Sequence, residues 1–379
     1  MKTKKGLYIL LLLVLLLLCV GSIKPFYTSK QLNGWREEAK KPLLYKKVLL
    51  DGVFQQEFEA YYNEKVKFRN DLIRLRNQIY YYCFNVILND KIIAGKNNTV
   101  YEKGYIYNAL FGMYSSIWAD KKEESRKIFM IQDTLTKMGK EFLFICAPGK
   151  GTYCPENIPS YLLHVPKKIP PQTEYMQYFK KDGVNYIDFD KWFIELKQKG
   201  IAPLYSKYGI HYNKYGCYLV IDSLSKYFNK KYDFMPEVVL DSIVEDYSVW
   251  ENENDCYESA NLIFPPKKEK LSHPYFHYQK KEGKRLKCIF VGDSYIWPLV
   301  LLNFDKDYFQ DSQYWYYFNE VSFADGRQKT TIDKIDILKE IADADVMILV
   351  FTNATTLDLD NGFTEKIYEL YYGKQDNKN

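Results

Sequence analysis

The sequence is poor in histidine and lacks the paired cysteines of metal and redox sites. Only four histidines occur among 379 residues, and none of the seven cysteines lies in a Cys-x-x-Cys spacing. Zinc sites and thiol redox sites are typically built from such spacings. We therefore expect no metal and no cofactor, and a catalytic base has to be sought among very few histidines.

The chain also lacks a concentrated charge. Its formal net charge is +5, but four of its 53 basic residues are lysines that flank the N-terminal apolar run, which leaves 49 basic against 48 acidic residues. A nucleic-acid-binding protein needs a strongly positive surface. The composition therefore argues against nucleic acid as a partner and against a broad polyanion-binding surface.

An uncharged, leucine-rich run stands at the N-terminus. Residues 6–23 follow Lys2, Lys4 and Lys5, and Lys24 closes the run. Its 18 residues are slightly fewer than the roughly 20 of a membrane-spanning helix, so we expect a transmembrane anchor, with a cleaved signal peptide as the alternative. Because basic flanks stay in the cytoplasm, the rest of the chain is expected on the periplasmic or extracellular side of a bacterial cytoplasmic membrane.

Changes in pattern divide the chain into three regions. Residues 1–24 are the anchor or signal, residues 25–90 predict a helical stalk or packing arm with a break near Arg69, and residues 91–379 form one α/β domain. This domain begins with a hairpin, since residues 95–98 supply turn residues between two short apolar runs. Residues 229–284 are charged and aromatic without a clear period, which indicates an insertion or lid.

Helices and strands alternate along the α/β domain. The hydrophobic periodicity predicts helices at residues 123–138, 173–181, 191–199, 215–228 and 331–342, and strands at 142–147, 184–189, 286–292, 313–318 and 345–351. Such alternation is typical of a doubly wound, mostly parallel sheet flanked by helices.

One of these strands ends in a Gly-Asp-Ser sequence. The apolar run from Leu286 stops at Gly292, and Ser294 follows at the turn into a helix that we expect to open at Pro298, because proline is tolerated in the first helical turn. Ligands bind where the carboxyl ends of such strands meet. Ser294 is therefore a candidate nucleophile, although Gly-Asp-Ser is also common in ordinary turns.

A serine nucleophile needs a neighbouring base, which is usually histidine. His211 lies in a loop that feeds directly into a helix between two predicted strands. His164 lies in another loop, and His273 and His277 lie in the insertion. His211 is the first candidate, His273 or His277 are alternatives, and a purely structural histidine is the third possibility.

In their order along the chain, these motifs resemble the SGNH-hydrolase-like polysaccharide O-acetyltransferases of the alginate acetylation type, AlgJ and AlgX. The His211 loop resembles the family's Asp-x-His-Trp-Asn-x-x-Gly motif, and residues 292–295 resemble its Gly-Asp-Ser-Tyr block. Residues 93–106 resemble its Gly-Lys-turn entry segment. Residues 147–159 resemble its Pro-x-Lys…Tyr-Pro-Glu…Pro loop.

This resemblance implies an SGNH-like α/β fold with Ser294 as nucleophile and His211 as base. The family's orienting aspartate falls on Gly209, so that role does not carry over. Three arrangements remain: a Ser-His dyad oriented by a backbone carbonyl, a carboxylate supplied from elsewhere such as Asp188 or Asp190, or a degenerate site.

Three further residues are candidates for contacts with the reacting groups. Oxyanion donors are expected from the backbone N–H groups around Ser294 and Tyr295 and from the Asn353 side chain, and Lys150 could meet an anionic sugar. The expected function is O-acetyl transfer to a polysaccharide acceptor, with the acetyl donor supplied by a membrane-bound O-acyltransferase that the resemblance implies. The alternatives are a carbohydrate esterase with the same Ser-His pair and a non-catalytic polysaccharide-binding or assembly protein.

Overall fold

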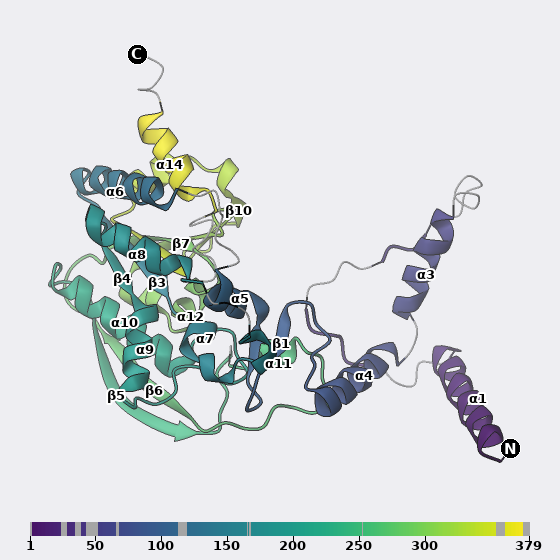
Figure 1. Cartoon of the computed structure of the whole chain (residues 1–379). Helices are drawn as coiled ribbons and strands as arrows, with labels where there is room; N and C mark the ends of the chain where they lie inside the picture. The colour runs from purple at the N-terminus through teal and green to yellow at the C-terminus, as the bar shows by residue number, and fades with distance from the viewer. Residues whose placement is uncertain are drawn as a thin grey trace. The chain divides into compact units, whose positions relative to one another are not determined.

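The computed structural model describes residues 2–23, 29–34, 39–42, 52–65, 68–112, 120–164, 166, 168–251, 253–353 and 361–373 (Figure 1). The chain divides into two compact units. The first consists of residues 1–92 and 257–266, and the second of residues 93–256 and 267–379. The candidate site lies entirely within the second unit.

The described part of the first unit is largely helical. It contains α1 (Lys2–Ile23), α3 (Val53–Lys65) and α4 (Arg69–Phe84). The helical break that we predicted near Arg69 falls at Phe68, whose left-handed backbone (φ 60°) precedes α4. We expected a transmembrane helix at residues 6–23; among the described residues no helix is long and apolar enough to cross a membrane.

A seven-stranded sheet forms the centre of the second unit. Its strand order is β10-β9-β8-β7-β11-β3-β4, and the pairings from β8 to β4 are parallel, while β9 and β10 extend the sheet antiparallel. The predicted mostly parallel sheet is therefore confirmed. The strands are β3 (Glu141–Ala147), β4 (Tyr186–Asp188), β7 (Lys287–Gly292), β8 (Gln310–Tyr316), β9 (Glu320–Phe323), β10 (Thr330–Thr331) and β11 (Val346–Thr352).

Helices cover both faces of this sheet because its central strands are apolar on both sides. In β3, Phe142 and Phe144 belong to one hydrophobic cluster and Leu143 and Ile145 to another, as alternate residues of a strand must. The first cluster includes residues of α6 (Lys121–Lys137), α8 (Pro171–Asp182), α13 (Ile337–Asp343) and α14 (Phe363–Tyr372). The second includes residues of α9 (Phe189–Gln198), α10 (Lys214–Asn229) and α12 (Ile296–Leu301).

Two predicted helix boundaries are wrong. The helix expected from Pro298 begins at Ile296, which is possible because the first-turn N–H groups of a helix need no intrahelical acceptor, so proline also fits there. The helix expected at residues 331–342 is split, because Thr331 belongs to β10, a short 3-10 turn (Ile332–Lys334) follows, and α13 starts after Asp336 caps it. The Asp336 side chain accepts a hydrogen bond from the Lys339 N–H.

The predicted insertion contains a long antiparallel hairpin. Strands β5 (Glu237–Asp246) and β6 (Leu271–Gln279) pair with each other in a separate two-stranded sheet. Residues 247–270 connect them and include the short helix α11 (Asp255–Glu258).

The smaller elements of the second unit complete the fold. The predicted entry hairpin is present as β1 (Ile92–Ala94) and β2 (Val100–Glu102). The others are α5 (Lys103–Phe111), α7 (Lys150–Tyr153), two 3-10 turns (Pro155–Asn157 and Ser160–Leu162) and a π-helical turn (Phe304–Tyr308).

Candidate active site

The turn that carries Ser294 is fixed between two parallel strands. β7 ends at Gly292, where a Cβ atom would lie 2.0 Å from the carbonyl oxygen of Val350 in β11, so only glycine lets the strands approach this closely. The buried Asp293 carboxylate then accepts hydrogen bonds from Thr352 N (2.8 Å), Thr352 Oγ1 (2.9 Å) and Tyr295 N (2.9 Å). Asp293 therefore holds the serine turn against the end of β11.

The loop that carries His211, residues 199–213 between α9 and α10, is held by polar contacts at both of its ends. Tyr205 and Tyr212 form an isolated antiparallel bridge across it. At its end, the Asn213 side chain caps α10 by accepting a hydrogen bond from Gly216 N (2.9 Å) and donates to the carbonyl of Pro203 (2.7 Å). These contacts fix the conformation of a segment that has no regular secondary structure.

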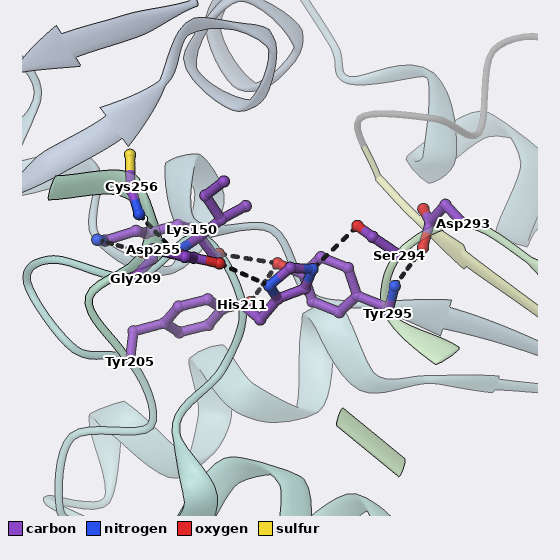
Figure 2. Close-up of polar contacts among 10 residues, drawn as sticks. Lys150, Tyr205, Gly209, His211, Asp255, Cys256, Asp293, Ser294 and Tyr295 are labelled. Carbon is purple, nitrogen blue, oxygen red and sulfur yellow. Dashed lines mark hydrogen bonds and ion pairs between the residues drawn. The ribbon is translucent and has the colours of Figure 1, made fainter. Parts of the chain in front are cut away.

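Ser294, His211 and Asp255 form a continuous line of contacts, shown in Figure 2. His211 Nε2 lies 2.9 Å from Ser294 Oγ, and His211 Nδ1 lies 3.2 Å from Asp255 Oδ2. A carboxylate beside Nδ1 favours the tautomer with its proton there, which leaves Nε2 free to accept the serine proton. Ser294 is only partly buried, so a substrate can reach it.

The histidine ring is held by packing as well as by hydrogen bonds. His211 is 8% exposed, and its ring centroid lies 4.7 Å from that of Tyr295. The Tyr295 hydroxyl donates to the carbonyl of Ile210 (3.1 Å), directly before the histidine. The residue after the candidate nucleophile therefore positions the candidate base.

The orienting carboxylate comes from the insertion. Asp255 lies in the β5–β6 connection, and its Oδ1 accepts hydrogen bonds from the N–H groups of Ile210 (2.8 Å) and Cys256 (2.6 Å). Of the three arrangements left open by the sequence, the structure corresponds to a carboxylate supplied from elsewhere, but neither Asp188 nor Asp190 supplies it. No local motif marks Asp255, which is the first residue of the short helix α11 and follows His211 by 44 residues.

Two other carboxylates of the same connection bind the His211 loop. Glu269 Oε2 accepts hydrogen bonds from Ser206 Oγ (2.9 Å) and Lys207 N (2.8 Å). Glu253 Oε1 accepts one from Lys214 N (3.1 Å), at the start of α10. Glu253 is buried, and this burial raises its pKa above the ordinary value. The insertion therefore supports the His211 loop along its whole length.

Lys150 is not exposed to a substrate, in contrast to the prediction. It is 2% exposed, and its Nζ donates to the carbonyls of Val100 (2.7 Å), Lys207 (2.8 Å) and Gly209 (2.7 Å). Burial lowers the pKa of this ammonium. The buried Lys150 ammonium thus links two carbonyls of the His211 loop to the second strand of the entry hairpin.

Two of the expected oxyanion donors, the Tyr295 N–H and the Asn353 side chain, have other partners. The Tyr295 N–H donates to Asp293, and the Asn353 amide nitrogen donates to Thr152 Oγ1 (2.8 Å) and Asp190 Oδ1 (2.9 Å). The Ser294 N–H donates to no described residue and is therefore the backbone donor that this turn leaves for an oxyanion.

A buried polar network surrounds Asn353. Asp190 Oδ1 also accepts hydrogen bonds from Gly149 N (3.2 Å) and Thr152 Oγ1 (2.5 Å). Burial is the main cause that raises the pKa of Asp190 to about 6. This network joins the ends of β3 and β11 beside the Ser294 turn, and Asp190 acts in it as a structural acceptor.

The other histidines lie elsewhere. His164 is exposed, His273 lies 3.5 Å from Asp246, and His277 lies 3.0 Å from Asp241. Among the described residues no group of three histidine, cysteine, aspartate or glutamate side chains could hold a metal ion, and the six cysteines from Cys83 to Cys288 are free thiols.

Ser294, His211 and Asp255 thus lie in line where the parallel strands end, an arrangement that can carry out nucleophilic acyl transfer. No protein-family model matches the sequence, and no curated protein matches it.

Solved structures of known proteins are similar to this chain. One is the O-acetyltransferase domain of Pseudomonas putida AlgJ, with 12% identity, 74% of this chain and 99% of that chain covered, and a TM-score of 0.46. A second is Pseudomonas aeruginosa AlgX, with 12% identity, 74% and 66% coverage, and a TM-score of 0.44. A third is Bacillus cereus PatB1 with a sulfonyl adduct, with 13% identity, 64% and 91% coverage, and a TM-score of 0.39. AlgJ and AlgX are of the type that the sequence motifs resemble.

Proposed function

We propose that this chain is an O-acetyltransferase that moves an acetyl group to a hydroxyl of a polysaccharide through an acetyl-Ser294 intermediate. The observation that carries the proposal is the line of contacts from Asp255 through His211 to Ser294. Three side chains from separate segments meet there in the order that nucleophilic acyl transfer requires. The polysaccharide acceptor is the substrate class implied by the motif resemblance.

In the first half-reaction, His211 Nε2 accepts the proton of Ser294 Oγ while this oxygen attacks the acetyl carbonyl carbon. The bond between that carbon and the donor oxygen breaks, and His211 gives its proton to the departing oxygen. Asp255 stabilises the imidazolium that forms between these steps. The Ser294 N–H donates to the oxyanion.

In the second half-reaction, His211 accepts the proton of an acceptor hydroxyl, whose oxygen attacks the acetyl carbon. The Ser294 ester bond breaks and His211 returns the proton to Ser294 Oγ. Attack by water in place of the sugar would make the chain an esterase. The acetyl donor would come from a membrane-bound O-acyltransferase.

The test is incubation of the protein with p-nitrophenyl acetate, with and without an oligosaccharide acceptor. We expect a protein adduct heavier by one acetyl group, acetate release, and acetylated oligosaccharide when the acceptor is present. Ser294→Ala is expected to abolish the adduct, and His211→Ala to slow its formation. Wild-type protein that forms neither adduct nor product would show that the site is not catalytic, and acetate without acetylated sugar would identify an esterase.

A further inference from the structure

A groove runs along the hairpin strand β6, outside the Ser294 site. It has a volume of about 510 Å³ and lies between β6 and the end of α12. Its polar lining residues include Lys214, Asp241, Tyr275, His277, Asn303 and Asp307. All belong to the second unit, and none takes a role in the proposed acyl transfer.

The groove offers an aromatic surface next to polar groups. Tyr275 is 50% exposed although it stands in a strand, and the Lys214 ammonium lies 4.6 Å from its ring centroid. The next residue, Phe276, turns the other way and packs against Tyr218 with ring centroids 5.1 Å apart. The Lys214 ammonium lies over one face of the Tyr275 ring, and the exposed part of the ring can stack against the C–H face of a sugar.

A β-bulge directs a carboxylate into the same groove. Leu240 pairs with Phe276 and Ser242 pairs with Tyr275, so Asp241 is an extra residue between them. Its carboxylate oxygens lie 3.0 and 3.1 Å from His277 Nδ1. A proton held on Nδ1 leaves Nε2 of the neutral ring as an acceptor for a hydroxyl group, and this nitrogen has no partner among the described residues.

The charges of the groove balance. Lys214 and Lys280 oppose Asp241 and Asp307, and Asn303 adds an amide that can both donate and accept hydrogen bonds. An anionic ligand would meet two carboxylates, and a cationic ligand two ammonium groups. An uncharged ligand with many hydroxyl groups meets donors and acceptors without a charge conflict.

The groove is close to the candidate active site along the chain. Lys214 follows His211 by three residues, and Leu301, in the groove wall, ends the helix that begins two residues after Ser294. A six-residue helix spans about 9 Å. An extended oligosaccharide is long enough to occupy both places.

We infer that this groove is a saccharide-binding subsite for an uncharged stretch of the acceptor chain, with Tyr275 as the stacking surface and His277 and Asp241 as hydrogen-bonding groups. The inference rests on the proposed function for the identity of the polymer. It adds the place where the polymer is held and the charge class of its sugars.

The test is binding of neutral hexasaccharides (cellohexaose, maltohexaose and chitohexaose) and of an anionic polyguluronate hexamer to the full chain, measured by calorimetry and saturation-transfer NMR. We expect at least one neutral hexasaccharide to bind, with preference over the anionic one. Tyr275→Ala is expected to weaken that binding at least tenfold, and Tyr275→Phe to preserve most of it. The matched control is Tyr247→Ala, which removes a similarly exposed tyrosine (56% against 50%) of the same hairpin region that lies outside the groove.

Three outcomes would overturn the inference: no neutral hexasaccharide binds, the anionic hexamer binds more tightly, or Tyr275→Ala binds as the wild type does. Turnover of p-nitrophenyl acetate on the same samples separates this inference from the proposed function. Turnover without hexasaccharide binding overturns only the inference that the groove binds saccharide. Binding through Tyr275 without turnover overturns the catalytic proposal alone.

Discussion

Asp255 Oδ2 lies 3.2 Å from His211 Nδ1, although 44 residues separate the two in sequence. The carboxylate belongs to the connection of a hairpin, and the imidazole belongs to a loop of the central α/β fold. The glycine at position 209 therefore does not leave His211 without an orienting group.

The first prediction concerns this carboxylate. Asp255→Asn keeps the shape of the side chain but removes the charge that stabilises the imidazolium, and its amide can present a donor to Nδ1. We expect p-nitrophenyl acetate turnover to fall by up to about 10⁴-fold, the size of the effect in a serine protease triad. Steady-state kinetics measure this directly.

Glu245→Gln is the matched control for Asp255→Asn, because Glu245 is an exposed carboxylate of the same hairpin, paired with Lys270 on the surface. Its turnover should equal that of the wild type. If Asp255→Asn also retained full turnover, Asp255 would be only a structural acceptor for the N–H groups of Ile210 and Cys256.

The second prediction concerns Lys150. Lys150→Met removes three hydrogen bonds and leaves the carbonyls of Val100, Lys207 and Gly209 without that donor. Unsatisfied buried groups cost about 1–3 kcal/mol each, so we expect a loss of unfolding free energy on the order of 3 kcal/mol. Denaturant unfolding measures it.

The control for Lys150→Met is Lys207→Met, which changes an exposed lysine side chain in the same loop. Its stability should remain within about 0.5 kcal/mol of the wild type. Equal stability of the two variants would show that the hydrogen bonds of the Lys150 ammonium do not stabilise the fold.

The third prediction concerns Gly292. A methyl group there would lie 2.0 Å from the Val350 carbonyl oxygen, so Gly292→Ala must push β7 away from β11. We expect a loss of about 1–3 kcal/mol in unfolding free energy. We also expect a larger fall in turnover than stability alone explains, because Asp293 and Ser294 follow directly. A melting temperature equal to that of the wild type would show that the strands can separate without strain.

The fourth prediction concerns the pH dependence of stability. Burial raises the pKa of Asp190 from 3.8 to about 6, so between these values the folded protein binds more protons than the unfolded chain. The contribution of Asp190 is therefore most favourable below pH 3.8 and is lost as the pH rises through about 6. The whole shift corresponds to at most about 3 kcal/mol.

Asp190→Asn removes this titration. Relative to the wild type, its unfolding free energy should rise as the pH increases from 4 to about 7, and the measurement is denaturant unfolding across that range. A constant difference between the two proteins would mean that Asp190 titrates at its ordinary value in the folded state.

The central fold could be predicted because its signals are local. Phe142 to Ala147 and Val346 to Phe351 are continuous apolar runs, and each lies in a strand that is buried along its whole length. The hairpin β5–β6 could not be predicted in this way, because β5 is exposed at most positions and shows no alternation of apolar and polar residues.

In the candidate site, too, the residues with local sequence signals could be predicted and the others could not. Ser294 and His211 stand beside regular elements, and the structure brings them to 2.9 Å. Asp255 is fixed by long-range contacts to Ile210 and His211, which no spacing in the sequence reveals. Lys150 follows a strand in a segment where a lysine is usually exposed and could meet a sugar, yet it is buried and its ammonium donates to three backbone carbonyls.

The position of Asp255 on the hairpin connection also determines how the site can be lost in evolution. The hairpin region that brings this carboxylate also carries Tyr275 and His277, so a single deletion of residues 237–279 would remove both the charge behind the base and the groove. Ser294 and His211 would remain in the sequence of the shortened descendant. A related chain can therefore keep both Ser294 and His211 and still lack the hairpin that supplies Asp255.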